Sequence, residues 1–348
     1  MSDAASAVDT AARDLLQDLV STPSPTGEER ACAERLAAFF EAHDREVWLD
    51  DVGNVRAPAD DRVLFTSHVD TVPGDIPVRV EERDEGPELW GRGSVDAKGP
   101  LAALAVAAVR TGVSFVGVVG EEVDSRGARF LVEDRDAPDA VVNGEPSGWD
   151  GVTLGYRGIL QGTYVSTSES GHTSRPENNA IQDAIAWWSR VEAEFENDPY
   201  EPVFEQVTAK PVDVAGGTSD DGLSVEATLN VQLRVPPSMT CDEVREIADG
   251  HLEEGHVNWN DQVRPTMQSP RNPVGRAFRV AIRGAGGDPR LLRKTGTSDM
   301  NIFAGTWDCP MATYGPGDSA LDHAPDEHLP LGELDRAVAV LEEVAHEL

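Results

Sequence analysis

The segment VSFVGVVGEE, residues 113–122, is an almost wholly apolar run that ends in two adjacent acids. Short apolar runs also occur at residues 62–66, 89–91 and 140–142, and apolar residues at helical spacing fill residues 98–109. Buried strands that alternate with helices indicate an α/β fold with a mostly parallel sheet and helices on both faces. Functional sites in such sheets lie beyond the carboxyl ends of the strands. We therefore expect functional residues directly after these apolar runs.

The pattern changes near residue 159 and changes back near residue 270. Helices are predicted at residues 7–20 and 27–42 before the first strands. From residue 159 the order becomes strand, helix, two strands, helix and strand, which is typical of a ferredoxin-like α+β domain; the predicted ranges are 160–166, 180–195, 203–214, 223–235, 241–254 and 257–267. The alternation of helices and short strands then returns, with elements predicted at residues 274–283, 289–294, 311–314 and 331–347. We therefore expect a catalytic domain at residues 1–158 and 270–348, interrupted by a lid or dimerisation domain at 159–269.

The net charge excludes some partners. The 348 residues include 63 acidic and 29 basic side chains, for a formal net charge of −34. Such a surface repels both nucleic-acid phosphates and anionic membranes, and no apolar run approaches the ~20 residues of a membrane span. Three scattered cysteines form neither a disulfide framework nor a metal pair, and the N-terminal residues do not resemble a signal peptide. We expect a cytoplasmic protein with neither a nucleic acid nor a membrane as partner.

The acidity is matched by a shortage of lysine. Lys98, Lys210 and Lys294 are the three lysines among the 29 basic residues. This combination resembles proteins from halophiles that accumulate salt, where a Debye length of ~3 Å at molar salt screens the self-repulsion. We interpret the acidity as adaptation to salt.

His68 and Asp70 directly follow the strand predicted at residues 62–66. Their side chains project to the same side of an extended chain, so one can bind a metal ion while the other orients it. A core histidine with satisfied hydrogen bonds is the alternative for this pair taken alone. Asp96, between a short strand and a helix start, has the alternative role of a helix N-cap.

Glu121 and Glu122 point in different directions from the end of an apolar strand. One such carboxylate can ligate a metal ion while its neighbour takes a proton from water. Glu145 follows another strand-like run, and His323 lies near the C-terminus in the segment DHAPDEH. An acid-rich chain supplies carboxylates by chance, but it does not supply the histidines or the apolar strands that precede these acids.

Eight short motifs occur in a fixed order: HVDTVP, GRGSVDAKGP, the adjacent glutamates, NGEPS, YRG, GHTSRPENNA, GTSDMN and DHAPDE. In this order they resemble the zinc-dependent amidohydrolases and peptidases of the M20 family over nearly the whole chain. The resemblance implies the interrupted α/β architecture, two metal ions in the larger domain, and a lid that commonly mediates dimerisation. A homodimer is therefore expected.

The resemblance also implies the metal ligands. His68, Asp96 and Glu145 would hold one ion, and Asp96, Glu122 and His323 the other, with Asp96 bridging the two. Zinc accepts imidazole nitrogen and carboxylate oxygen and lowers the pKa of bound water toward ~7. Cobalt or manganese suits the same ligands. We expect two divalent metal ions, with zinc first and cobalt second.

Three catalytic roles follow from the same resemblance. Glu121 is expected to be the general base and Asp70 the residue that orients His68. His172, in GHTSRP, is expected to reach across the dimer to the tetrahedral oxyanion, with an ordinary loop histidine as the alternative.

Six further residues match positions that bind or border the substrate in this family: Arg157, Asn230, Arg234, Thr297, Ser298 and Asp299. Arginine offers a planar fork of donors to a carboxylate, although Arg234 has the alternative of an ordinary surface arginine. Asp299 has two interpretations, a helix cap or a partner for a cationic substrate end.

The amide that is cleaved is also suggested by resemblance. Glu145 stands where aminopeptidase-like relatives carry aspartate, which favours deacylases and carboxypeptidases. The chain length and the segments SVDAKGPLAA and KTGTSDMN most resemble the hydrolases that release lysine or ornithine from the acidic amino-group carrier protein LysW. In those enzymes the bond joins the side chain of the carrier's C-terminal glutamate to the amino acid's α-amino group.

Two alternatives stay open. One is an N-acetylornithine deacetylase or a succinyl-diaminopimelate desuccinylase, which share the machinery and differ in the acyl group. The other, of a different class, is a metal-binding scaffold without catalytic activity. The presence of Glu121 favours an enzyme over a scaffold, because a catalytically inactive relative would be expected to lose the general base.

Overall fold

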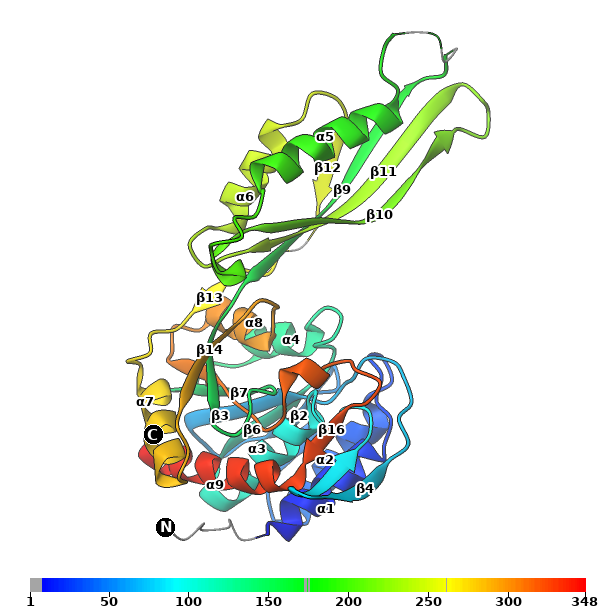
Figure 1. Cartoon of the computed structure of the whole chain (residues 1–348). Coiled ribbons are helices and arrows are strands. Elements are labelled where there is room, and N and C mark those ends of the chain that lie inside the picture. Colours follow the sequence, from blue (N-terminus) through cyan, green and yellow to red (C-terminus); the bar gives the residue numbers. More distant parts are fainter. Residues whose placement is uncertain (1–7, 172–173, 175, 261) are drawn as a thin grey trace. The chain divides into compact units, whose positions relative to one another are not determined.

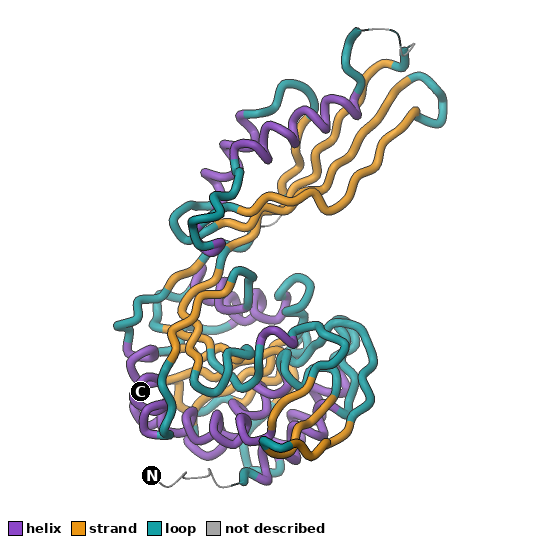
Figure 2. Tube along the Cα trace, in the orientation of Figure 1, coloured by secondary structure: helices purple, strands orange, loops and turns teal. Residues whose placement is uncertain are grey.

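The computed structural model describes residues 8–171, 174, 176–260 and 262–348. The chain forms two compact units, which Figures 1 and 2 show with their helices and strands. The larger unit comprises Met1–Leu154, Gln268–Leu292 and Ser298–Leu348. The smaller unit comprises Gly155–Met267 and Arg293–Thr297.

Four parallel strands form the centre of the main sheet in the larger unit. They are adjacent in the order β6 (Val113–Val118), β3 (Asp60–His68), β7 (Val141–Gly144) and β15 (Met311–Thr313). The predicted α/β class and its mostly parallel central sheet are thus confirmed. Antiparallel strands flank the centre: β1 (Trp48–Leu49), β2 (Val55–Ala57), β8 (Gly151–Tyr156) and β13 (Thr266–Met267), while β14 (Arg290–Lys294) also pairs with β8.

Helix α3 (Lys98–Thr111) is the most deeply buried helix among the described residues of the larger unit, with every residue from Lys98 to Ala108 buried. Its alanine-rich, apolar surface suits a helix covered all round, and it packs against β3, α1 (Thr10–Val20) and α9 (Leu331–Glu347). The Lys98 ammonium donates hydrogen bonds to the carbonyls of Leu19 (3.0 Å) and Thr22 (2.8 Å). The buried charge thereby fixes the start of α3 to the end of α1.

The remaining helices of the larger unit lie around the same core. Figure 1 shows α4 and α8 on one side of the central strands and α3 and α9 on the other. The bounds of the helices not yet given are α2 (Arg30–Glu41), α4 (Arg126–Asp134), α7 (Pro273–Gly284) and α8 (Asp299–Thr306). In the part of the chain that the structure describes, no helix has the length and hydropathy needed to cross a membrane.

A second, small sheet of the larger unit brings the C-terminal region beside a segment from the first third of the chain. Its strands are β4 (Arg79–Arg83), β5 (Gly86–Trp90) and β16 (His328–Pro330), and β16 pairs with β5 through His328 opposite Trp90. The segment before β16 therefore lies beside the loop that follows β5.

The smaller unit has the element order strand, helix, two strands, helix, strand. These elements are β9 (Gly158–Glu169), α5 (Ala180–Glu194), β10 (Thr208–Thr218), β11 (Ser224–Val235), α6 (Cys241–Gly250) and β12 (His256–Trp259). The strands form an antiparallel sheet in the order β10-β11-β9-β12, and Figure 1 shows α5 and α6 on one face of it. The core between helices and sheet includes Trp187, whose indole N–H donates to the carbonyl of Ala248 (3.0 Å).

Two predicted strands of this unit differ in the structure. The strand predicted at residues 203–214 begins later, because Val203–Glu205 forms a 3₁₀ turn after Pro202, and β10 follows from Thr208. The strand predicted at residues 257–267 is wrong, since its ends belong to two strands, β12 and β13, which pair with β9 and β8 respectively. Pro265 has no N–H to donate to a ladder, which is consistent with a break there.

Candidate metal centre

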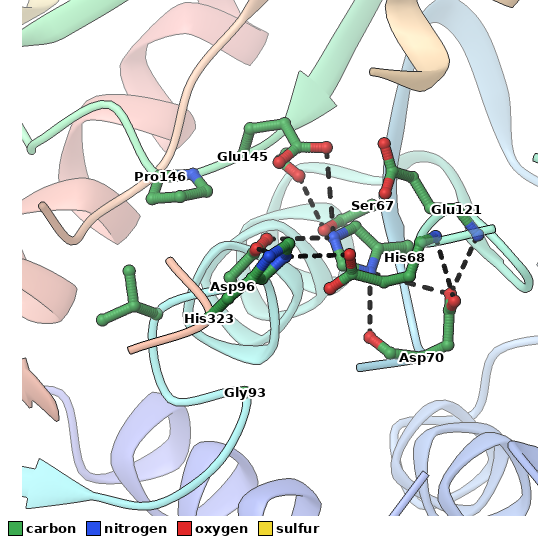
Figure 3. A network of polar contacts seen from close by, with 12 residues as sticks. Ser67, His68, Asp70, Gly93, Asp96, Glu121, Glu145, Pro146 and His323 are labelled. Atoms are coloured by element: carbon green, nitrogen blue, oxygen red, sulfur yellow. Dashed lines mark hydrogen bonds and ion pairs between the residues drawn. The ribbon is translucent and has the colours of Figure 1, made fainter. Parts of the chain in front are cut away.

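The parallel register brings three strand ends together at one edge of the main sheet. His68 at the end of β3 pairs with Val118 at the end of β6, and Ser67 pairs with Gly144 at the end of β7. The residues that follow these ends, Glu121 and Glu145 among them, therefore reach the same region, as Figure 3 shows. This juxtaposition is the one that the sequence predicts from the carboxyl ends of parallel strands.

A first group of potential ligands consists of His68, Asp96 and Glu145, all buried. The His68 Nε2 atom lies 3.3 Å from Asp96 Oδ1 and 4.0 Å from Glu145 Oε1. One donor atom from each residue lies within 4.8 Å of the others, which is close enough for all three to contact one ion.

A second group consists of Asp96, Glu122 and His323. The His323 Nε2 atom lies 3.2 Å from Asp96 Oδ2 and 3.0 Å from Glu122 Oε2. Asp96 thus offers a different oxygen to each group, as a bridging carboxylate must. His323 has a left-handed backbone (φ 62°), a strained conformation for a residue other than glycine and one that is concentrated at functional sites.

Asp70 organises this edge in two ways. Its main-chain carbonyl lies 2.9 Å from His68 Nδ1, so an N–H at Nδ1 donates to that carbonyl and leaves Nε2 free to face the acids. Its carboxylate accepts hydrogen bonds from the N–H groups of Gly120 (2.9 Å), Glu121 (3.1 Å) and Glu122 (3.2 Å). Gly120 has a positive φ of 79°, which glycine adopts without strain, and this lets the chain turn sharply after β6. The Asp70 carboxylate therefore fixes the turn that carries both adjacent glutamates.

The pKa values reflect the crowding of carboxylates. Burial by itself lowers the pKa of His68. The hydrogen bond to Asp96 and the charges of Glu145, Glu121 and Asp70 outweigh burial and hold this pKa well above its ordinary range. Burial, reinforced by the charge of Glu145, raises the pKa of Glu121 well above its usual range.

The pKa of His323 rises as well. Its hydrogen bond to Asp96 and the charge of Glu122 overcome burial and raise the pKa of the imidazole to about 9. Burial alone would raise the pKa of Asp96, but its hydrogen bonds to His323 and His68 lower it well below its usual range.

The chemistry of this region fits divalent metal ions. Glu122 Oε1 is buried and has no hydrogen-bond partner among the residues that the structure describes. Burying an ionised oxygen without a partner is costly, and a cation supplies the missing interaction. Imidazole nitrogen and carboxylate oxygen are the donors that zinc, cobalt and manganese accept. The larger unit thus contains two adjoining candidate sites for metal ions.

Glu327 is a buried residue beside these sites that was not predicted from the sequence. It is 0% exposed and accepts hydrogen bonds from main-chain N–H groups of the loop that ends in Asp96. It lies four residues after His323 within DHAPDEH, but that spacing alone does not distinguish it from other acids of an acidic chain.

The predicted substrate residues of the smaller unit differ in their surroundings. Arg157 directs its guanidinium to the carbonyls of Thr295 (2.9 Å) and Val203 (3.1 Å), among other acceptors in this unit. Half-buried Arg234 donates to Thr297 Oγ1 at 3.4 Å and forms no ion pair with another described residue.

Two further predicted residues belong to the smaller unit. Asn230, on β11, accepts from the hydroxyl of Thr163 (2.8 Å) and donates to Asp213 (3.4 Å). His172 lies outside the described residues.

Ser298 and Asp299 lie in the larger unit at the start of α8. Ser298, and not Asp299, is the N-cap, since the Ser298 hydroxyl accepts from the N–H of Met300 (3.3 Å). Asp299 is 1% exposed, and burial raises the pKa of its carboxyl to about 7, although Ser125 donates a hydrogen bond to it. The negative charge of Asp299 contributes to the high pKa of Glu121, so Asp299 lies near the predicted base.

Residues 64–347 match the model of Peptidase family M20/M25/M40, and the chain belongs to this family. It is 40% identical to the LysW-lysine hydrolase of Deinococcus radiodurans, with 95% of each chain covered. It is 29% identical to the LysW-lysine/LysW-ornithine hydrolase of Sulfurisphaera tokodaii, covering 92% of this chain and 91% of that one. Its fold resembles the M20 family metallo-carboxypeptidase Sso-CP2 from Sulfolobus solfataricus, with a TM-score of 0.78 at 17% identity, covering 97% of this chain and 98% of that one.

Proposed function

We propose that this protein is a metal-dependent amide hydrolase that releases lysine or ornithine from the amino-group carrier protein LysW. The relatives named as hydrolases of LysW-lysine and LysW-ornithine support the substrate, because they match the chain over almost its whole length. The observation that carries the reaction type is the Asp96 carboxylate, whose two oxygens face two separate groups of ligand atoms beside Glu121. We expect the reaction to take place in the cytoplasm.

His68, Asp96 and Glu145 would hold one metal ion, and Asp96, Glu122 and His323 the other. Zinc is the first candidate and cobalt the second, since both accept this mixture of nitrogen and oxygen donors. Such a pair of ions, when bound, lowers the pKa of water and polarises the carbonyl of the amide bond.

Glu121 would be the general base. Burial and the charge of Glu145 raise the pKa of its carboxyl, and a carboxylate of higher pKa is the stronger proton acceptor. Glu121 would take a proton from the attacking water and transfer it to the leaving α-amino nitrogen as the C–N bond breaks. The Asp70 carboxylate would keep Glu121 in place through its main-chain N–H.

The smaller unit would be the ferredoxin-like lid, and it would mediate a homodimer. Its strand order β10-β11-β9-β12 and its β-α-β-β-α-β element order support the ferredoxin-like assignment. Arg234, a half-buried cation that donates a hydrogen bond to the neutral hydroxyl of Thr297, would bind a free carboxylate of the substrate. Arg157, Asn230 and Thr297 would support this recognition, and His172 would stabilise the oxyanion from the partner subunit.

The test is a release assay in molar KCl with zinc or cobalt. Carrier protein charged with lysine or ornithine is the substrate, N-acetylornithine is offered in parallel, and the free amino acid is quantified. We expect release from the carrier and little cleavage of N-acetylornithine. Cleavage of N-acetylornithine alone would identify a deacetylase and contradict the proposal.

Glu121→Gln is the matched catalytic control. The amide has the size of the carboxyl but cannot accept and release the proton, so we expect turnover to fall about 10²- to 10⁴-fold while the metal content stays near that of the unmodified protein. A variant that keeps most of its activity would contradict the role of Glu121.

A further inference from the structure

Glu327 is buried between two loops that carry predicted metal ligands. Its Oε1 atom accepts hydrogen bonds from the N–H groups of Val95 (2.8 Å) and Asp96 (3.0 Å). Its Oε2 atom accepts from the N–H of Gly93 (3.0 Å) and from the Arg92 guanidinium (2.7 Å). One carboxylate thus binds the whole turn that ends in the bridging aspartate.

Arg92 extends this contact to the segment of His323. In addition to its bond to Glu327, Arg92 donates two hydrogen bonds to this segment. Its Nη1 atom donates to the carbonyl of Ala324 (3.3 Å), and its Nη2 atom donates to the carbonyl of His323 (3.5 Å). Figure 3 shows Gly93 in the loop below Asp96 and His323. Residues more than 200 positions apart in the chain are therefore joined through one buried ion pair, of which Glu327 is fully buried and Arg92 largely so.

Glu327 is not itself placed to bind a metal ion or a proton of the reaction. A carboxylate offers about four acceptor positions, and four hydrogen bonds occupy them here. Its effect must therefore pass through the groups it holds. Ligands keep their geometry only where a surrounding shell of hydrogen bonds fixes them, and loss of such a partner commonly weakens metal binding 10- to 100-fold.

We propose that Glu327 and Arg92 form a positioning clamp that sets Asp96 and His323 at the distance needed to share the second metal ion. This inference rests on the ligand roles given under the proposed function and adds to them the residues that assemble the second site. Glu122, the third member of that group, is held separately by Asp70 through its main-chain N–H. The clamp therefore holds two of the three ligands of the second group, Asp96 and His323, but only Asp96 of the first group.

The test is Glu327→Gln in the full-length protein, with cobalt chloride as the probe. The amide oxygen can still accept from Val95 and Asp96, but the new NH₂ group faces two donors, Gly93 N–H and Arg92, and the clamp opens on that side. We expect the second cobalt ion to bind 10- to 100-fold more weakly than in the unmodified protein, and the first ion, of whose ligands the clamp holds only Asp96, to lose less affinity. Calorimetric titration gives the two affinities, and the visible absorption of bound cobalt reports the coordination of each ion.

Asp335→Asn is the matched control. Asp335 is another buried carboxylate of the larger unit, and it accepts from Arg13 (2.6 Å) and from the N–H of Asp9 (3.0 Å), neither of them a predicted ligand. We expect Asp335→Asn to lower stability without changing either cobalt affinity. A His323→Ala variant supplies the titration curve and spectrum of a protein that lacks the second site.

Two results would overturn the clamp. The first is a Glu327→Gln protein that binds both cobalt ions like the unmodified protein and merely unfolds earlier, as Asp335→Asn does. The second is an unmodified protein that binds no cobalt, because there would be no ligands to position. If Glu327→Gln does not fold, Arg92→Met decides, since it leaves Glu327 bonded to three main-chain N–H groups; unchanged affinity for the second ion in Arg92→Met would equally refute the clamp.

These outcomes are separate from a failure of the proposed function. A protein that binds two cobalt ions but releases nothing from the charged carrier would refute the substrate and leave the clamp intact. The clamp is judged by metal affinity and spectrum alone.

Discussion

Binding of the second metal ion should depend steeply on pH through His323. Its hydrogen bond to Asp96 and the charge of Glu122 raise the pKa of the imidazole to about 9 in the ion-free protein. A metal ion binds only the unprotonated nitrogen, so the proton must leave first. At pH 7 about one His323 side chain in 100 is unprotonated, and at pH 8 about one in 10. We therefore expect the affinity for the second ion to rise about tenfold from pH 7 to pH 8 and to level off above pH 9.

Calorimetry tests this expectation directly. Protein already loaded with one equivalent of cobalt is titrated with the second at pH 7 and pH 8, each in two buffers of different ionisation enthalpy. The difference in heat between buffers should correspond to about one proton released per second ion at pH 7. His323→Asn, which keeps a neutral donor that does not titrate, should lose this release. Equal affinities at pH 7 and pH 8 in the unmodified protein, with no proton released, would refute the reasoning.

Three further predictions concern the substrate, the salt and a buried acid. Arg234→Gln should raise the KM for a substrate with a free carboxylate about 10- to 100-fold with little change in kcat, because one charged hydrogen bond is lost. Steady-state kinetics with one substrate that carries this carboxylate and one that lacks it test the prediction. Turnover of the acidic carrier should rise with KCl concentration more steeply than turnover of a small acyl-ornithine, because salt screens the repulsion between the carrier and a chain of net charge −34. An equal rise in turnover for both substrates would contradict this prediction. Burial raises the pKa of Asp299 from 3.8 to about 7, so the folded state keeps a proton that the unfolded state loses, and stability falls as pH rises between these values. From pH 5.5 to pH 7 the free energy of unfolding should fall by about 1.6 kcal/mol. Denaturant unfolding of the ion-free protein should show this fall in the unmodified chain but not in Asp299→Asn.

The main strands and the residues after them could be predicted from sequence because burial leaves a simple pattern. The central residues of β3, β6 and β7 are mostly apolar, as is typical of strands covered on both faces, and polar residues follow near the end of each strand. Since parallel strands end at one edge of the sheet, the sequence predicts that His68, Glu121 and Glu145 lie close together.

Other features left no such pattern. Strands β1 and β16 are only two and three residues long, and an apolar run that short is common by chance. Glu327 is one acid among 63, and its importance comes from main-chain N–H groups more than 200 residues earlier in the chain. Hydrogen bonds of a side chain to a distant backbone do not depend on the identity of the residues that donate, so a single sequence carries no trace of them.

The burial of Lys98 has a practical consequence for labelling. Its ammonium is 1% exposed and bonded to two carbonyls, so reagents that attack amines will react with it slowly. The other two lysines, Lys210 and Lys294, both belong to the smaller unit, and Lys210 is exposed. Apart from the N-terminal amine, an amine-directed fluorophore will therefore mark the smaller unit without any mutation. Paired with a second dye on a cysteine introduced into the larger unit, it gives a distance probe for whether substrate brings the two units together.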